Sequence, residues 1–206
     1  MSESNDLPVR TEVFAWIRDH EHVFYDPRQT VDPIGVYFSP QTRNYFPREF
    51  TGAFKGAMNV LLKSHREFQI VTPRTLSSFH GRLLIVPAAQ HVAGAEMASL
   101  HSQSEHRFEL ATSEISASAL PPQKVSVTAS PSAVAQIAQV HGKLHVFLDN
   151  FGEKDTATVS FPATAGSEVH VLPFLGTASK LPAQKMGDQL IAKIPGFQGA
   201  VVVWCE

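Results

Sequence analysis

Short apolar runs with an amphipathic helical pattern between them dominate the first half of the chain. The run at 34–37 precedes the helical pattern, and further runs follow at 68–71 and 83–86. The apolar positions of the helical pattern are Phe50, Phe54, Met58, Leu61 and Leu62. Continuous apolar strands around an amphipathic helix are typical of β-α-β units in a parallel sheet. The pattern therefore predicts an α/β domain over residues 31–120, after a helix and connector over residues 1–30.

The period changes to two beyond a proline-containing linker near Pro121. Leu144, Val146 and Leu148 alternate with more polar or outward positions, and further alternating runs are separated by glycine-rich turn signals. Such runs are typical of antiparallel strands with one buried face. We expect a small antiparallel β-sandwich over residues 121–206, with one short helix at Ser132 to Gln139.

Composition and charge narrow the class of protein. The 206 residues are 43% hydrophobic and 17% charged, with a formal net charge of -2. This balance suits a globular protein and gives no electrostatic reason to expect nucleic acid or an anionic membrane as partner. The sequence has neither an apolar run of about 20 residues nor an apolar signal core. We expect a cytoplasmic protein, although a piece of a longer secreted precursor would look the same.

Cysteine and histidine usage predicts neither a metal nor a cofactor. Cys205 is the single cysteine, so an intramolecular disulfide and a cysteine zinc cluster are excluded. Its penultimate position favours a structural thiol over a nucleophile. His20 and His22 lie two residues apart and would point to different sides of a helix. No glycine-rich phosphate loop or nucleophile elbow follows the first predicted strand.

One edge of the predicted parallel sheet carries the candidate ligand-binding residues. Open parallel sheets bind ligands beyond the carboxyl ends of their strands. The residues that follow the first two strands are Ser39, Thr42, Arg43, Tyr45, Arg48, Thr72 and Arg74. Their arginines could bind a carboxylate or phosphate. The alternative is that they make interdomain salt bridges and hydrogen bonds to loop carbonyls.

No catalytic pair emerges from the acidic residues. Glycoside hydrolysis needs two carboxylates roughly 5 to 10 Å apart across a sugar cleft. The glutamates weighed for this role are Glu49, Glu67, Glu96, Glu105, Glu109 and Glu114. All fall in predicted loops or on polar helix faces, so we assign no catalytic residue. A carbohydrate-binding β-sandwich is a further alternative, with Trp204, Phe174 and Phe197 as stacking candidates.

Several segments resemble β-galactosidases of glycoside hydrolase family 42 and related glycosidase-like proteins. The marks are Y-F-S-P at 37–40, G-A-M-N-V-L-L at 56–62, F-Q-I-V-T-P at 68–73 and a strand ending in V-P at 86–87. They are similar to the amidotransferase-like middle domain of that family. The segments V-H-V-L-P-F-L-G and G-A-V-V-V-W look like its small carboxyl-terminal β domain. The segment T-E-V-F-A-W-I-R-D-H-E-H-V-F is similar to a helix that leads out of the barrel.

The resemblance implies a fold and a noncatalytic role. The fold would be α/β plus all-β: a reduced flavodoxin-like, class I amidotransferase-like parallel sheet followed by the β-sandwich. In the family this middle domain follows a catalytic TIM barrel and helps to form trimers. A barrel takes about 250 residues, more than this chain holds. We therefore expect an assembly or scaffold portion of a glycoside hydrolase, with a second copy, a barrel-bearing glycosidase domain or a carbohydrate as partner. The rival is a small enzyme or a small-molecule binding protein that uses the sheet-edge residues.

Overall fold

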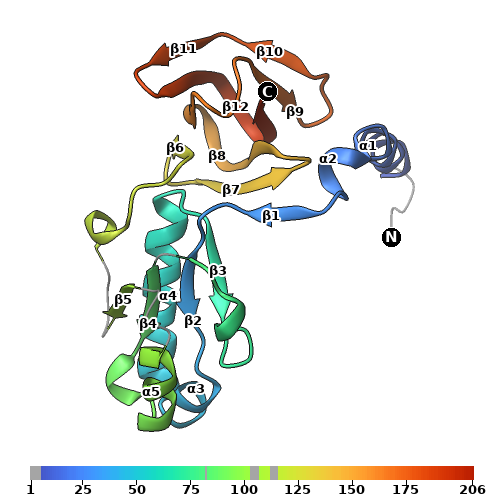
Figure 1. The fold of residues 1–206 in the computed structure, drawn as a ribbon. Coiled ribbons are helices and arrows are strands. Elements are labelled where there is room, and N and C mark those ends of the chain that lie inside the picture. Colours follow the sequence, from blue (N-terminus) through green and yellow to red (C-terminus); the bar gives the residue numbers. More distant parts are fainter. Residues whose placement is uncertain (1–5, 82, 103–106, 112–115) are drawn as a thin grey trace.

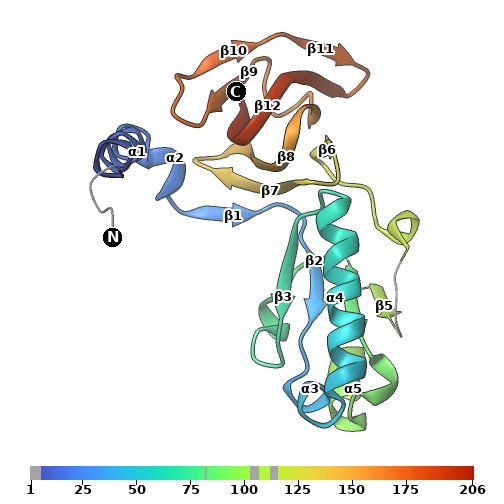
Figure 2. The ribbon, with the colours of Figure 1, turned by 180° about the vertical axis from the view of Figure 1, so that it is seen from behind.

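The computed structural model describes residues 6–81, 83–102, 107–111 and 116–206. Figures 1 and 2 show two lobes, one around a large antiparallel sheet and the other around a small parallel sheet. The parallel sheet lies below the antiparallel sheet in these views, and the amino-terminal helices lie at one end of the antiparallel sheet.

The parallel sheet has four strands in the order β3-β2-β4-β5. Its strands are β2 (Ile34–Tyr37), β3 (Phe68–Val71), β4 (Leu83–Pro87) and β5 (Arg107–Ala111). The connecting helices are α3 (Pro40–Tyr45), α4 (Pro47–Lys63) and α5 (Gly94–Ser102), with 3-10 turns at Leu76–Ser78, Ala89–His91 and Ala117–Ala119. The β-α-β pattern between residues 34 and 86 is therefore confirmed.

Two apolar layers cover this sheet. Ala57 and Leu61 of α4 pack with Ile34 and Ile85 on one face. On the other face, a second cluster joins the sheet to the 3-10 turn at Leu76–Ser78 and to α5; its buried members include Tyr37, Leu76, Phe79, Leu84, Val86 and Leu100. The alternation of consecutive strand residues between the two faces explains why these strands are apolar throughout.

The antiparallel sheet has eight strands and encloses the largest core of the described residues. The path β1-β7-β8-β12-β9-β10 is extended by β6, which pairs with β8, and by β11, which pairs with β12. The strands are β1 (Arg28–Thr30), β6 (Ser126–Thr128), β7 (Ala133–Val140), β8 (Lys143–Pro162), β9 (Val169–Pro173), β10 (Ser179–Leu181), β11 (Ala183–Met186) and β12 (Gln189–Cys205). Cys205 lies fully buried in this core, and burial raises the pKa of its thiol. A structural role follows for this residue.

Long, bent strands replace several turns that the sequence predicts. β8 and β12 pair along most of their lengths, with register shifts between Ile194 and Phe197 and between Phe197 and Gly199. Gly199 adopts a φ of 78°, which favours glycine. The helix predicted at Ser132 to Gln139 is wrong, because these residues belong to β7 and hydrogen-bond to β8. Backbone pairing with a distant segment therefore outweighs the local turn signals.

The predicted fold class is also wrong. Most strands belong to one antiparallel sheet of eight, whereas the parallel sheet has only four short strands. The chain is therefore not a flavodoxin-like or class I amidotransferase-like protein with a small appended sandwich. β1 lies in the segment expected to be a connector, yet it pairs with β7 and extends the antiparallel sheet.

The amino-terminal helices rest on the antiparallel lobe. Helix α1 spans Leu7–Asp19 and α2 spans Glu21–Phe24. Trp16 fixes their position, because its Nε1 donates a hydrogen bond of 2.8 Å to the carbonyl of Gly176 and its ring packs edge-on against Phe174. No helix within the described part of the chain combines the length and apolar character needed to cross a bilayer.

Candidate functional site

A buried hydrogen-bond network lies where β2 ends. Ser39 caps α3, because its hydroxyl accepts a hydrogen bond of 3.0 Å from the backbone N–H of Thr42. Pro40 follows at the first helical position, where its missing N–H costs nothing. The sequence S-P therefore acts locally as a helix start.

Glu96 of α5 joins this cap to the sheet. Its two carboxylate oxygens accept hydrogen bonds of 2.8 Å from the hydroxyls of Tyr37 and Ser39. The hydroxyl of Thr42 donates to the carbonyl of His91 at 3.3 Å. Burial, and then the Glu96 carboxylate, raise the pKa of Tyr37, so its hydroxyl stays protonated as a donor. The network ties α3 and α5 to one end of the sheet.

Only two of the predicted ligand-binding residues enter this network. Ser39 and Thr42 do so, and both side chains are 1% exposed. The loop after β3 forms its own turn, in which Thr72 and Thr75 hydrogen-bond. The remaining candidates, Arg43, Tyr45, Arg48 and Arg74, are exposed. Within the described part of the chain, the three arginines form no ion pair or hydrogen bond with a carboxylate, so their binding of an anion stays a prediction.

Sequence reasoning missed Tyr37 and Glu96 as partners of Ser39. Tyr37 closes an apolar strand and resembles a core residue, whereas Glu96 lies 57 residues beyond Ser39 and is separated from it by two further strands. A polar residue in the first turn of the helix after the third strand was the available signal. The contact itself depends on the strand order, because β2 and β4 are neighbours.

Replacing Glu96 with alanine should destabilise the parallel lobe. The hydroxyl of Tyr37 would lose its acceptor in a buried site, and the hydroxyl of Ser39 would keep only Thr42 Oγ1. We expect a loss of about 1–3 kcal/mol in the free energy of unfolding. Urea denaturation measures the loss. Glu12→Ala is the matched control, because Glu12 is an exposed helical glutamate. Equal stability of the two variants would contradict a structural role for the network.

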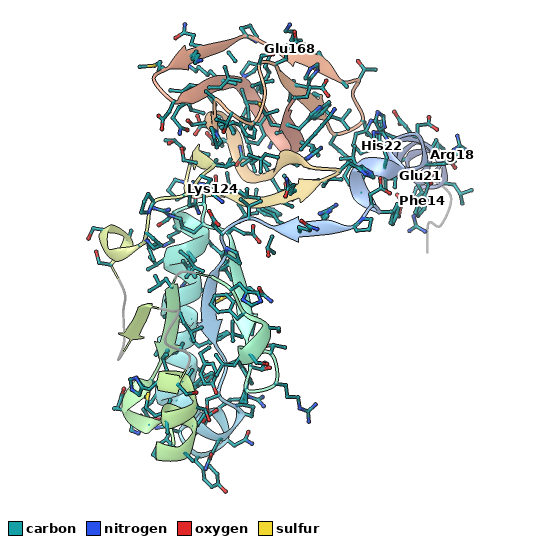
Figure 3. All side chains as sticks on the ribbon, viewed as in Figure 1. Phe14, Arg18, Glu21, His22, Lys124 and Glu168 are labelled. Carbon is teal, nitrogen blue, oxygen red and sulfur yellow. The ribbon has the colours of Figure 1, made fainter. Side chains whose placement is uncertain are left out.

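Three consecutive residues join the two lobes just after α4. His65 Nε2 donates to the carbonyl of Ser130 at 3.2 Å, and Arg66 Nη1 donates to the carbonyl of Pro121 at 2.8 Å. Glu67 Oε2 accepts a hydrogen bond of 2.7 Å from the backbone N–H of Ile137 in β7. Figure 3 shows Lys124 in the same junction, where it pairs with Asp32 at 3.3 Å.

A cavity of about 500 Å³ lies beside this junction. We call it the junction cavity; its lining includes Phe24, Phe68, Phe147, Arg28, Arg66 and Asp149. It is bounded by α2, the end of α4 and the outer face of the antiparallel sheet. The Arg28 guanidinium lies 4.1 Å from the centre of the Phe147 ring and donates to the carbonyl of Phe24 at 3.0 Å. Burial lowers the pKa of both Arg28 and Arg66.

Three aromatic rings form a row on the outer face of the antiparallel sheet. Trp204 of β12 lies between His145 of β8 and His170 of β9, with ring centres 6.0 and 5.3 Å away and ring planes within 15°. Because a histidine faces each side of the indole, its faces are not free for a sugar. Phe197 lies in the core and Phe174 packs against Trp16. Trp204 and Phe197 therefore serve packing in this structure, whereas Phe174 contacts Trp16 and is 46% exposed.

Comparison with known proteins finds similarity in the structure and none in the sequence. No protein-family model matches the sequence, and no curated protein matches it either. The structure is similar to α-L-fucosidase isoenzyme 2 from Paenibacillus thiaminolyticus, with 9% sequence identity and a TM-score of 0.65, over 93% of this chain and 51% of that chain. A weaker likeness is to a rhamnosidase from Novosphingobium sp. PP1Y, with 13% identity and a TM-score of 0.48, over 88% and 23% of the respective chains.

The likeness to the fucosidase shows the fold alone. This chain has the fold of part of a glycoside hydrolase structure and spans about half the length of the fucosidase chain.

Proposed function

We propose that this chain is a noncatalytic assembly portion of a glycoside hydrolase-like protein. The fold similarity to half of an α-L-fucosidase chain supports the glycoside hydrolase-like part of this proposal. Two exposed apolar side chains of α1, Leu7 and Phe14, carry the proposal, because they offer a contact for another protein domain.

Helix α1 presents different residues to the protein and to solvent. Trp16 and Ile17 are partly buried toward the antiparallel lobe, whereas Leu7 and Phe14 are 67% and 69% exposed. Residues seven apart lie on one side of a helix. Figure 3 labels Phe14 and Arg18 on α1 and Glu21 and His22 on α2, at the same end of the antiparallel lobe. Exposed apolar side chains with a charged rim are typical of a protein interaction surface.

The glutamates weighed for catalysis support a noncatalytic role. Glu96 accepts hydrogen bonds from Tyr37 and Ser39, and Glu67 accepts one from the backbone of Ile137. Glu49 is exposed in the first turn of α4. Glu105 and Glu114, together with the side chain of Glu109, lie outside the described residues. The described glutamates thus serve as hydrogen-bond acceptors or face solvent.

Replacing Phe14 with aspartate should disrupt assembly without unfolding the chain. We expect the unmodified chain to self-associate, and the variant to weaken this association at least tenfold because a charge would enter an apolar contact. Size-exclusion chromatography with light scattering measures the change over a concentration series. Phe151→Asp is the matched control, since Phe151 is 75% exposed on the antiparallel lobe.

The same experiment separates the two possible partners. The chain could stay monomeric and use Phe14 to bind a barrel-bearing glycosidase domain encoded beside it. In that case the assembly role would hold, with that domain as the partner. A strictly monomeric chain that binds no such domain would overturn the proposal. Equal effects of the Phe14 and Phe151 variants would show that α1 is not the contact.

A further inference from the structure

We propose that the junction cavity binds a neutral polyhydroxylated ligand, the size of a mono- or disaccharide. The inference rests on the cavity itself and does not depend on the assembly role. Its volume of about 500 Å³ lies within the range of about 300–1,000 Å³ typical of small-molecule sites. Three phenylalanines from different elements contribute apolar wall, which suits the C–H faces of a sugar ring.

The cavity wall also carries both hydrogen-bond donors and a hydrogen-bond acceptor. Arg28 donates to neutral oxygens only: the Gln136 side chain at 3.2 Å and the carbonyls of Val23 and Phe24. Arg66 donates to the carbonyl of Pro121. Among the described residues, neither guanidinium lies within ion-pair distance of a carboxylate. Each therefore keeps N–H groups for a further acceptor.

Asp149 supplies the complementary acceptor. It lies on β8, directly opposite Ala200 of β12, and is partly buried. Its side chain makes no hydrogen bond or ion pair with the residues that the structure describes. A partly buried carboxylate without a donor is unfavourable unless water or a ligand supplies one. Asp149 is therefore the residue that most directly indicates a ligand.

The combination of these groups selects the class of ligand. An apolar molecule would desolvate Asp149 and the two guanidinium groups without replacing their hydrogen bonds. The lining holds two guanidinium groups, Arg28 and Arg66, and two carboxyl groups, Glu67 and Asp149, so its formal charges cancel and favour neither an anion nor a cation. Hydroxyl groups can donate to Asp149 and accept from both arginines. A neutral polyol with apolar ring faces therefore matches the hydrogen-bonding groups and the apolar side chains of the cavity better than the other classes of ligand do.

Binding to wild-type and variant chains tests the inference. The probes are neutral hexoses and disaccharides, with glucuronate, inorganic phosphate and toluene as the competing classes. Saturation-transfer NMR and calorimetry would report binding, and melting temperature would report stabilisation by the bound ligand. We expect saturable binding of at least one neutral sugar, and none of similar strength for the anions or toluene.

Two variants locate the site. Asp149→Ala should weaken sugar binding at least tenfold, whereas Asp188→Ala should leave it unchanged, because Asp188 is an exposed aspartate outside the cavity lining. Ala200→Leu fills the cavity from its wall and should also abolish binding. Circular dichroism confirms that each variant is folded. Absence of neutral-sugar binding, preference for an anion or toluene, or undiminished binding in the Asp149 and Ala200 variants would overturn the inference.

Discussion

Replacing Gly35 with alanine is expected to lower the free energy of unfolding by about 1–3 kcal/mol, the cost typical of an overpacked core. Gly35 lies in the middle of β2, where an added Cβ would come within 2.5 Å of Leu84 Cδ1 and 2.7 Å of the Phe79 ring. Both neighbours are almost completely buried, so neither can move without disturbing the layer around them. Urea denaturation followed by circular dichroism measures the loss.

Gly52 provides the matched control for this substitution. It lies on the exposed side of α4, where an added Cβ would meet no atom within 4 Å. Gly52→Ala should therefore raise the stability by about 1 kcal/mol through helix propensity. The same chemical change is thus expected to have opposite signs at the two sites. A loss at Gly52 or a gain at Gly35 would contradict the packing seen here.

Replacing Glu67 with glutamine is expected to stabilise the chain at neutral pH. Glu67 is 6% exposed, and burial raises the pKa of its carboxyl group, an effect that the Ile137 N–H hydrogen bond only partly opposes. Glutamine keeps an oxygen acceptor for that N–H but carries no charge. Leucine removes the acceptor, so Glu67→Leu should be less stable than Glu67→Gln by about 1–3 kcal/mol.

The sign of the pH dependence follows from the raised pKa. Below the pKa of the unfolded chain, Glu67 is protonated in both states and has no effect. As the pH rises from that value through the higher folded-state pKa, the folded state holds the extra proton, so stability falls. The advantage of Glu67→Gln should therefore appear across this interval and persist at higher pH. Urea midpoints measured from pH 4 to pH 8 check this, and an advantage that grows toward acid would contradict it.

The hydrogen bond of Glu67 also shows how the two lobes are coupled. β1 ends at Thr30, opposite Ala138, and the N–H of the next residue along β7, Ile137, is taken by the Glu67 carboxylate. The carboxylate thus continues the hydrogen bonding of β7 at the point where β1 leaves the sheet. Domain coupling in this chain depends on a side chain as well as on the linker.

The candidate site was only partly predictable. The position of Ser39 after the first strand indicated the correct end of the sheet, and the structure does gather polar groups there. However, Ser39 serves as a helix cap, and its acceptor Glu96 comes from a helix 57 residues away. The junction cavity had no signal in the sequence, because Arg66 and Asp149 lie more than 80 residues apart and meet only through the packing of two lobes.

The sequence by itself determined the local elements with a strong period. The β-α-β unit from Ile34 to Val86 follows from continuous apolar strands around one apolar helix stripe. Only the tertiary structure decided which strands pair. The bends within β8 and β12, the strand at β7 and the attachment of β1 all depend on backbone hydrogen bonds to distant residues, which local propensity does not encode.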